Sequence, residues 1–293
     1  MKSSAERASR ANALLGYPDD ARLLIVNADD FGMCGPVNDG VLRAITEGVA
    51  RSASLMVPWP GAGQAMRMLA GHPEADVGIH LSVVCDLPGN RCGPVAGADA
   101  VPSLVDGSGM FWPLERRAGF LARARLGELE TEYRAQIGAV IAAGLRPSHL
   151  DWHCLADGGR PDIFEMTLSL ATEHGLALRA HTPASIRRLR SLRLPGNEHG
   201  IMDSYHLGTG PATHAQRYVQ LLRDLPAGLT EWAIHPGIGR APLRDLEPST
   251  WWIRHADYEF AVSAQARETI EREGIVLLSH QPLREVWAAS QPR

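Results

Sequence analysis

The sequence has little cysteine, no long apolar run and no excess of one charge, and each absence excludes a class of protein. Its four cysteines form no C-x-x-C pair, and a chain of 293 residues needs no disulfide bonds to be stable. No segment is apolar over the length that spans a bilayer, and the first twenty residues lack the apolar core of a signal peptide. We therefore expect a cytoplasmic protein without a membrane partner.

The charge balance also restricts the partners. Lys and Arg number 29 against 33 Asp and Glu, for a net charge of -4, so a basic field that would attract nucleic acid is absent. The hydrophobic content of 45% is typical of a globular protein with a large core. We expect a small-molecule substrate and no nucleic acid, with a homodimer as the commonest assembly for such a chain.

Short apolar runs alternate with helical segments along the chain. The runs predict buried strands at residues 23–26, 54–57, 77–81, 148–150, 176–178, 232–234 and 275–278. Helical spacing predicts helices at residues 37–47, 62–70, 126–143, 163–174, 212–223 and 264–273. This alternation predicts an α/β fold, a single-domain (β/α) barrel of seven or eight parallel strands over residues 22–293, after an N-terminal extension of residues 1–21.

Two long connections, residues 82–115 and 181–210, interrupt this alternation. Loops of this length in a compact domain are usually functional, so we expect both to fold over the barrel mouth and to determine substrate choice. Trp112 in the first loop could stack on substrate or anchor the loop to the barrel. The second loop carries four arginines, which we interpret as solvent-exposed: Arg187, Arg188, Arg190 and Arg193.

Polar residues stand where several of the predicted strands end. The segment Asn27-Ala28-Asp29-Asp30-Phe31-Gly32 closes the first strand. Carboxyl ends of parallel strands face the active site of such folds, although one Asp alone would as readily cap the next helix. Because successive strand residues point to opposite faces, the two carboxylates are expected to have separate roles.

Three further strand ends carry histidine. His80 ends one strand, and a lone histidine of this kind is more often a hydrogen-bonded core residue than a ligand. His149, Asp151 and His153 would share one face of an extended strand, a spacing moderately specific for a metal site. His235 closes another strand in Glu231-Trp232-Ala233-Ile234-His235. Together these strand ends predict a catalytic centre.

These motifs resemble the YdjC family of carbohydrate deacetylases, also called the ChbG/HpnK family, over about residues 22–280. The segments that carry the resemblance are LLIVNADDFG, EGVARSASLMV, VGIHL, PSHLDWH, LALRA and EWAIHPG, in matching order and spacing. The resemblance implies a barrel of the glycoside hydrolase/deacetylase type. It also implies hydrolysis of the N-acetyl group of a small amino sugar, oligosaccharide or glycoconjugate intermediate.

The resemblance also implies residue roles. Asp30, His80 and His153 would bind one divalent metal ion, and Asp29 would act as general base. His235 is the candidate general acid, and Arg179 would keep the base ionised through a charge-assisted pair, although it could equally be a surface residue. Supporting or substrate-binding roles fall to His149, Asp151, Trp152, Glu231 and Trp112. The ligand types suit Zn, Co, Ni or Mn, whereas family members are often assigned Mg.

The chain departs from the family pattern directly after His153, where Cys154 follows in place of further histidines. Strand alternation places Cys154 on the face opposite His153, which disfavours a thiolate ligand. Trp152 could stack on a sugar or pack in the core. Two other functions stay open: a catalytically silent, metal-containing sugar-binding protein, and a metal phosphoesterase, which would need a second metal or a cationic phosphate clamp.

Overall fold

The computed structural model describes residues 10–290 apart from residues 88 and 90. Its main sheet contains the strands β1 (Arg22–Phe31), β2 (Ser52–Leu55), β3 (Val77–Leu81), β6 (His149–Trp152), β7 (Ala177–Leu178), β8 (Met202–Asp203), β9 (Gly228–Ile234) and β10 (Val276–Leu278). All pairs in this sheet are parallel, in the order β7-β6-β3-β2-β1-β9-β8, and β10 joins β1. The expected parallel α/β sheet of seven or eight strands is therefore confirmed.

β1 pairs with three other strands of this sheet, more than any other strand described. One edge pairs with β9 from Arg22 to Ala28. The other edge pairs first with β10 at Leu23 and then with β2 from Asn27 onward. Every residue of β1 after Arg22 is buried, as expected for a parallel strand covered on both faces.

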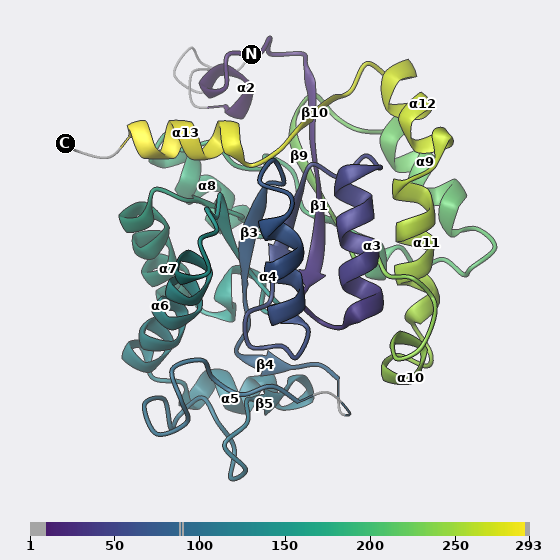
Figure 1. The fold of residues 1–293 in the computed structure, drawn as a ribbon. Helices are drawn as coiled ribbons and strands as arrows, with labels where there is room; N and C mark the ends of the chain where they lie inside the picture. Colours follow the sequence, from purple (N-terminus) through teal and green to yellow (C-terminus); the bar gives the residue numbers. More distant parts are fainter. Residues whose placement is uncertain (1–9, 88, 90, 291–293) are drawn as a thin grey trace.

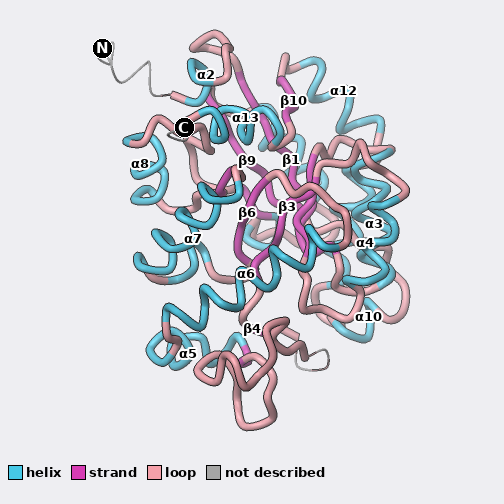
Figure 2. The backbone as a smooth tube through the Cα atoms, turned by 60° about the vertical axis from the view of Figure 1, so that its left-hand side comes forward, coloured by secondary structure: helices cyan, strands magenta, loops and turns pink. Residues whose placement is uncertain are grey.

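Helices surround the strands, as Figures 1 and 2 show. They are α2 (Ala11–Leu14), α3 (Gly35–Thr46), α4 (Ala62–Ala70), α5 (Arg117–Arg123), α6 (Leu126–Ala142), α7 (Pro161–His174), α8 (Pro183–Ser191), α9 (His214–Arg223), α10 (Leu243–Leu246), α11 (Trp251–Ala261), α12 (Ala264–Arg272) and α13 (Gln281–Ala289). In Figure 1, α13 lies near one end of the sheet, whereas β4 (Val84–Cys85), β5 (Trp112–Pro113) and α5 lie at the other. The β4–β5 segment thus lies near the carboxyl ends of the strands.

The sheet curves into a half-barrel and does not close. β7 and β8 are its two ends, and no pairing between them occurs within residues 10–290 as described. β7 and β8 have only two residues each, so they offer few backbone groups for closure.

The loop expected at residues 181–210 contains a helix, so that expectation was wrong in part. Thr182 accepts a hydrogen bond from the Ser185 backbone, the Ser185 side chain bonds back to Thr182, and Pro183 occupies the first turn. This capping box starts α8, whose buried Leu189 faces the core while Arg188 pairs with Glu165 at its surface. The helical start signal lay in the sequence, but the arginines obscured it.

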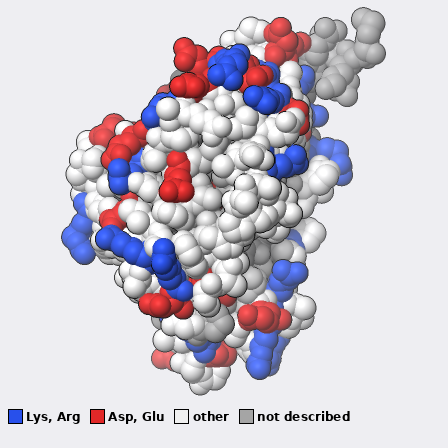
Figure 3. All heavy atoms as spheres, turned by 90° about the vertical axis from the view of Figure 1, so that its right-hand side faces the viewer, with Lys and Arg blue, Asp and Glu red and all other residues white. Residues whose placement is uncertain are grey.

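Charges of both signs are mixed on the face of the molecule in Figure 3. The positive side chains form no continuous basic area on this face. Within the described part of the chain, none of the helices has both the length and the apolar character needed to cross a membrane.

Candidate active site

The two carboxylates at the end of β1 both line one cavity of about 670 Å³. The expectation that they point to opposite faces was therefore wrong. Asp30 has a φ of +66°, and the pairing of β1 with β2 shifts register between Ala28 and Phe31. Aspartate tolerates this left-handed conformation better than most residues. The irregularity turns Asp30 toward the side of the sheet that Asp29 already faces.

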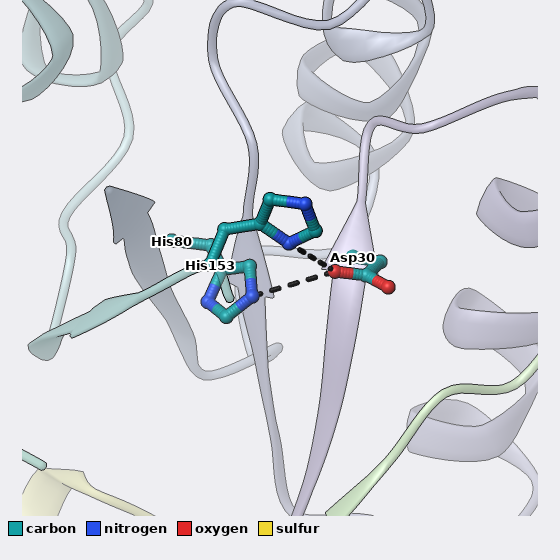
Figure 4. Close-up of side chains that lie close together, drawn as sticks. All are labelled: Asp30, His80 and His153. Carbon is teal, nitrogen blue, oxygen red and sulfur yellow. Dashed lines mark hydrogen bonds and ion pairs between the residues drawn. The ribbon is translucent and has the colours of Figure 1, made fainter. Parts of the chain in front are cut away.

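Asp30, His80 and His153 converge in this cavity (Figure 4). The Oδ1 atom of Asp30 lies 3.1 Å from His153 Nδ1 and 3.4 Å from His80 Nε2. Ligands held at about 2.0–2.2 Å by one tetrahedral Zn²⁺ are separated by roughly 3.3–3.6 Å. Both distances from the carboxylate oxygen are close to this range, so the three side chains can bind one divalent ion with little movement.

The surroundings orient both imidazoles toward Asp30. His80 Nδ1 lies 2.8 Å from Asp151 Oδ1, and His153 Nε2 lies 3.1 Å from Asp86 Oδ1. A carboxylate that accepts the proton of one ring nitrogen leaves the other nitrogen free for a metal ion. Asp151 and Asp86 therefore prepare the two histidines as ligands.

The electrostatic field of the site favours a cation. Burial by itself would lower the pKa of His80, but Asp151, Asp30 and Asp29 raise it to about 9. Burial would raise the pKa of Asp30, yet Arg254 and the two histidines hold it well below its ordinary value. Positive charge is thus stabilised next to the ionised carboxylates, as a bound metal ion would require.

Arg179 is buried among three carboxylates. Its Nη1 and Nη2 donate to Asp29 at 2.8 and 2.9 Å, Nη1 lies 2.9 Å from Asp151 Oδ2, and Nε donates to Glu231 at 2.6 Å. Burial would raise the pKa of Asp29, but Arg179 holds it below its ordinary value, and the pKa of Glu231 falls to about 2 for the same reason. The alternative of a surface arginine is excluded by its 2% exposure.

A ring of buried polar contacts ties Asp29 to the barrel interior. Asn27 Nδ2 donates to Asp29 at 2.6 Å, and Ser52 Oγ donates to Asn27 Oδ1 at 2.6 Å. His280 completes the ring, with Nδ1 3.0 Å from Ser52 Oγ and Nε2 3.4 Å from Glu231 Oε1. The members in order are Asp29, Arg179, Glu231, His280, Ser52 and Asn27. This ring fixes the Asp29 carboxylate from two directions.

The interpretation of His149, Asp151 and His153 as one ligand set was wrong. β6 ends at Trp152, so the alternation that would align His153 with the other two stops before it. Asp151 faces His80 and Arg179, whereas the His149 ring stacks on His280 with centroids 3.6 Å apart. His149 therefore packs beside the ring of polar contacts and does not reach Asp30.

Gly78 on β3 makes room for His149. A Cβ atom at Gly78 would lie 2.4 Å from the His149 ring, so Gly78→Ala must displace that imidazole from Ser54 and His280. We expect the variant to lose about 1–3 kcal/mol of unfolding free energy, measured by urea denaturation. Gly138→Ala on α6, where no atom lies within 4 Å, is the matched control and should be neutral or slightly stabilising. Equal effects of the two substitutions would contradict the packing argument.

His235 follows β9 and lines the cavity. Its Nδ1 lies 3.2 Å from Ser204 Oγ, which donates its own hydrogen to Asp257 Oδ2 at 2.6 Å. Asp257 also accepts the backbone N–H of His235, at 2.7 Å. Ser204 Oγ therefore accepts a hydrogen bond from Nδ1–H, and Nε2 is the ring nitrogen left for a substrate.

Both long connections contribute to the cavity wall, but Trp112 does not. Asp86, Leu87 and Leu114 come from the first segment, and Gly200, Ile201, Asp203, Tyr205 and His206 come from the second. Trp112 is absent from the described lining, and its ring packs 5.3 Å from the Arg123 guanidinium on α5. Trp152 lies in the wall but is 2% exposed and packs near Phe164, which fits a role in the core.

This geometry predicts that Trp112→Ala weakens the fold without altering specificity. Removal of a half-buried indole should lower the unfolding free energy by about 1–3 kcal/mol, because the loop loses its packing on α5. Thermal denaturation and rates on several acetylated sugars would test this. A changed ranking of substrates at unchanged melting temperature would indicate a pocket role instead.

Sequence reasoning missed several residues of the site. Arg254 on α11 lies 2.8 Å from Asp30 Oδ2 and also pairs with Glu247 at 2.7 Å, yet α11 was not predicted. The others are Asp86, Asp257, His280, Ser52 and Ser54. Only polar residues inside otherwise apolar strands, such as Ser52 and Ser54 in β2, gave a usable signal.

The fold and the position of the site define an α/β half-barrel with its chemistry at the strand ends. Residues 23–272 match the YdjC-like protein family, and the chain belongs to this family. A carbohydrate deacetylase from Geobacillus stearothermophilus is 36% identical over 76% of this chain and 82% of that protein. One from Enterococcus faecalis is 28% identical over 89% of this chain and 97% of that protein.

A solved structure is similar over nearly its whole length. It is an Enterococcus faecalis V583 protein provisionally named for cellobiose-phosphate cleavage, and it is 26% identical with a TM-score of 0.74. The similarity covers 90% of this chain and 99% of that one. The Enterococcus faecalis V583 protein therefore shares the half-barrel fold over nearly all of its own length.

Proposed function

We propose that this protein is a metal-dependent carbohydrate deacetylase that hydrolyses the N-acetyl group of a small amino sugar, oligosaccharide or glycoconjugate intermediate. The convergence of Asp30, His80 and His153 beside Asp29 in one cavity carries the proposal. The relatives named carbohydrate deacetylases support the reaction class. The cavity volume of about 670 Å³ is in the range of small-molecule sites.

Asp30, His80 and His153 would hold the metal ion. When bound, such an ion supplies Lewis-acid polarisation of the amide carbonyl and acidifies a water molecule. Zn²⁺ and Mg²⁺ are the first candidates, and Co²⁺, Ni²⁺ and Mn²⁺ also suit this donor set.

The remaining chemistry belongs to protein side chains. Asp29 is ionised, and its Oδ2 atom lies 4.0 Å from His80 Nε2. It accepts the proton of the attacking water as general base. Arg179 keeps this carboxylate ionised and oriented, so it acts as a positioning residue. In its imidazolium form His235 delivers the Nε2 proton to the departing amine, while Nδ1–H stays hydrogen-bonded to Ser204.

Acetate release from a panel of N-acetylated sugars tests the proposal. Chelator-treated protein should be inactive, and adding back Zn²⁺, Mg²⁺, Co²⁺, Ni²⁺ or Mn²⁺ one at a time should restore acetate release with at least one of them. Binding of sugars without any acetate release would favour a catalytically silent binding protein. Full activity after complete metal removal would contradict the role of the Asp30 cluster.

A further inference from the structure

Cys154 lies on the same side as His153, contrary to the alternation expected from the sequence. β6 ends at Trp152, and Cys154 has a φ of +59°, which ends the strand geometry. Its Sγ atom lies 3.4 Å from His153 Nε2. The thiol is thus placed beside the ring nitrogen that faces away from Asp30.

A second carboxylate completes a three-residue cluster. Asp86 Oδ1 lies 3.1 Å from His153 Nε2, and one ligand atom each from Asp86, His153 and Cys154 lies within 4.8 Å of the others. All three residues line the cavity, with Cys154 exposed and Asp86 partly exposed. Carboxylate, imidazole and thiolate are the three ligand types that Zn²⁺ takes in proteins.

We propose that Asp86, His153 and Cys154 form a second binding site for a thiophilic divalent cation such as Zn²⁺ or Cd²⁺. A soft sulfur ligand selects such ions and disfavours Mg²⁺, which prefers oxygen ligands. The site shares His153 with the Asp30 cluster but uses its other ring nitrogen, Nε2, whereas Asp30 faces Nδ1. It does not depend on the proposed deacetylase activity.

Ion binding at this site displaces two protons. The Nε2–H that otherwise donates to Asp86 and the Cys154 thiol proton both leave to the solvent, and their lone pairs bind the ion. When the Asp30 cluster also holds an ion, His153 would bridge the two as an imidazolate. The bound ion then lies in the wall of the substrate cavity. Binding itself is independent of activity, but its effect on catalysis rests on the proposed function: excess Zn²⁺ should slow acetate release by narrowing the cavity and displacing His153, whereas excess Mg²⁺ should not.

Titration of the full-length protein with Cd²⁺ tests the site without any activity measurement. A thiolate bound to Cd²⁺ gives an ultraviolet charge-transfer band, and the Asp30 cluster contains no sulfur that could produce it. We expect the band to rise to saturation as Cd²⁺ is added to the wild type and to vanish in Cys154→Ser. Asp86→Asn should keep the band but weaken Cd²⁺ affinity about tenfold or more.

Cys85→Ser is the matched control, because Cys85 and Cys92 form a separate thiol pair with sulfur atoms 3.2 Å apart. The band should survive this substitution. A band that persists in Cys154→Ser, or that vanishes only in Cys85→Ser, would assign the ion to the thiol pair and overturn the proposal. If acetate release is measurable, inhibition by excess Zn²⁺, relative to each variant's own rate, should disappear in Cys154→Ser.

Discussion

Asp29→Asn is expected to lower the rate of acetate release about 10²–10⁴-fold while the protein keeps its metal ion. An amide has nearly the shape of the carboxylate, and with its oxygen in the place of Oδ1 it still accepts from Asn27 Nδ2 and Arg179 Nη2, whereas the contact with Nη1 is lost. It cannot accept a proton from water at neutral pH, and the base is therefore lost. Asp29 Oδ2 lies 4.0 Å from His80 Nε2 and is not one of the three proposed ligands, so metal content should not change.

Asp30→Asn is the informative comparison at the adjacent residue. Its carboxylate faces both His80 and His153, so its neutralisation should reduce metal content as well as activity. Metal analysis by mass spectrometry and rates at saturating metal would separate the two variants. Equal metal loss in both would mean that the roles of the two aspartates are not divided in this way.

The strand ends were predictable because a parallel sheet places them at one edge. Asp29, His80 and His235 follow short apolar runs, and the rule that chemistry gathers at carboxyl ends brings them into one cavity. The central strands were predictable from the apolar pattern alone, because this pattern is strong where both faces of a strand are buried.

Departures from regular strand geometry were not predictable from alternation. The positive φ of Asp30 brings the two carboxylates together, and that of Cys154 turns its thiol toward His153. Arg254 reaches Asp30 from a helix, and no periodic pattern in a strand can report a contact made by a distant helix. These contacts depend on tertiary packing, which a single sequence does not display.

Arg179→Met is expected to destabilise the protein by about 3–5 kcal/mol at neutral pH, because it leaves buried carboxylates without their cation. Asp29, Asp151 and Glu231 are each less than 5% exposed, so water cannot replace the guanidinium. Methionine fills much of the same volume, which separates loss of charge from loss of packing. The midpoint of urea denaturation of metal-stripped protein measures the effect.

The unfolding free energy should depend on pH in opposite directions in the wild type and in Arg179→Met. In the wild type the pKa of Glu231 is lowered to about 2, so its contribution is present above its unfolded pKa of about 4.3 and is lost as pH falls toward 2. In Arg179→Met, burial without a cation raises the folded pKa of the carboxylates. Their protonated form then favours folding below the unfolded pKa, and stability falls as pH rises through the raised value.

The difference in unfolding free energy between the wild type and Arg179→Met should therefore be smaller at pH 5 than at pH 7. Arg188→Met is the matched control, since Arg188 lies on the surface of α8 and pairs only with exposed Glu165 among the described residues. It should change the unfolding free energy by less than about 1 kcal/mol at either pH. If Arg179→Met lowers the unfolding free energy by the same amount at pH 7 and pH 5, lost packing and not the unpaired carboxylates causes the destabilisation.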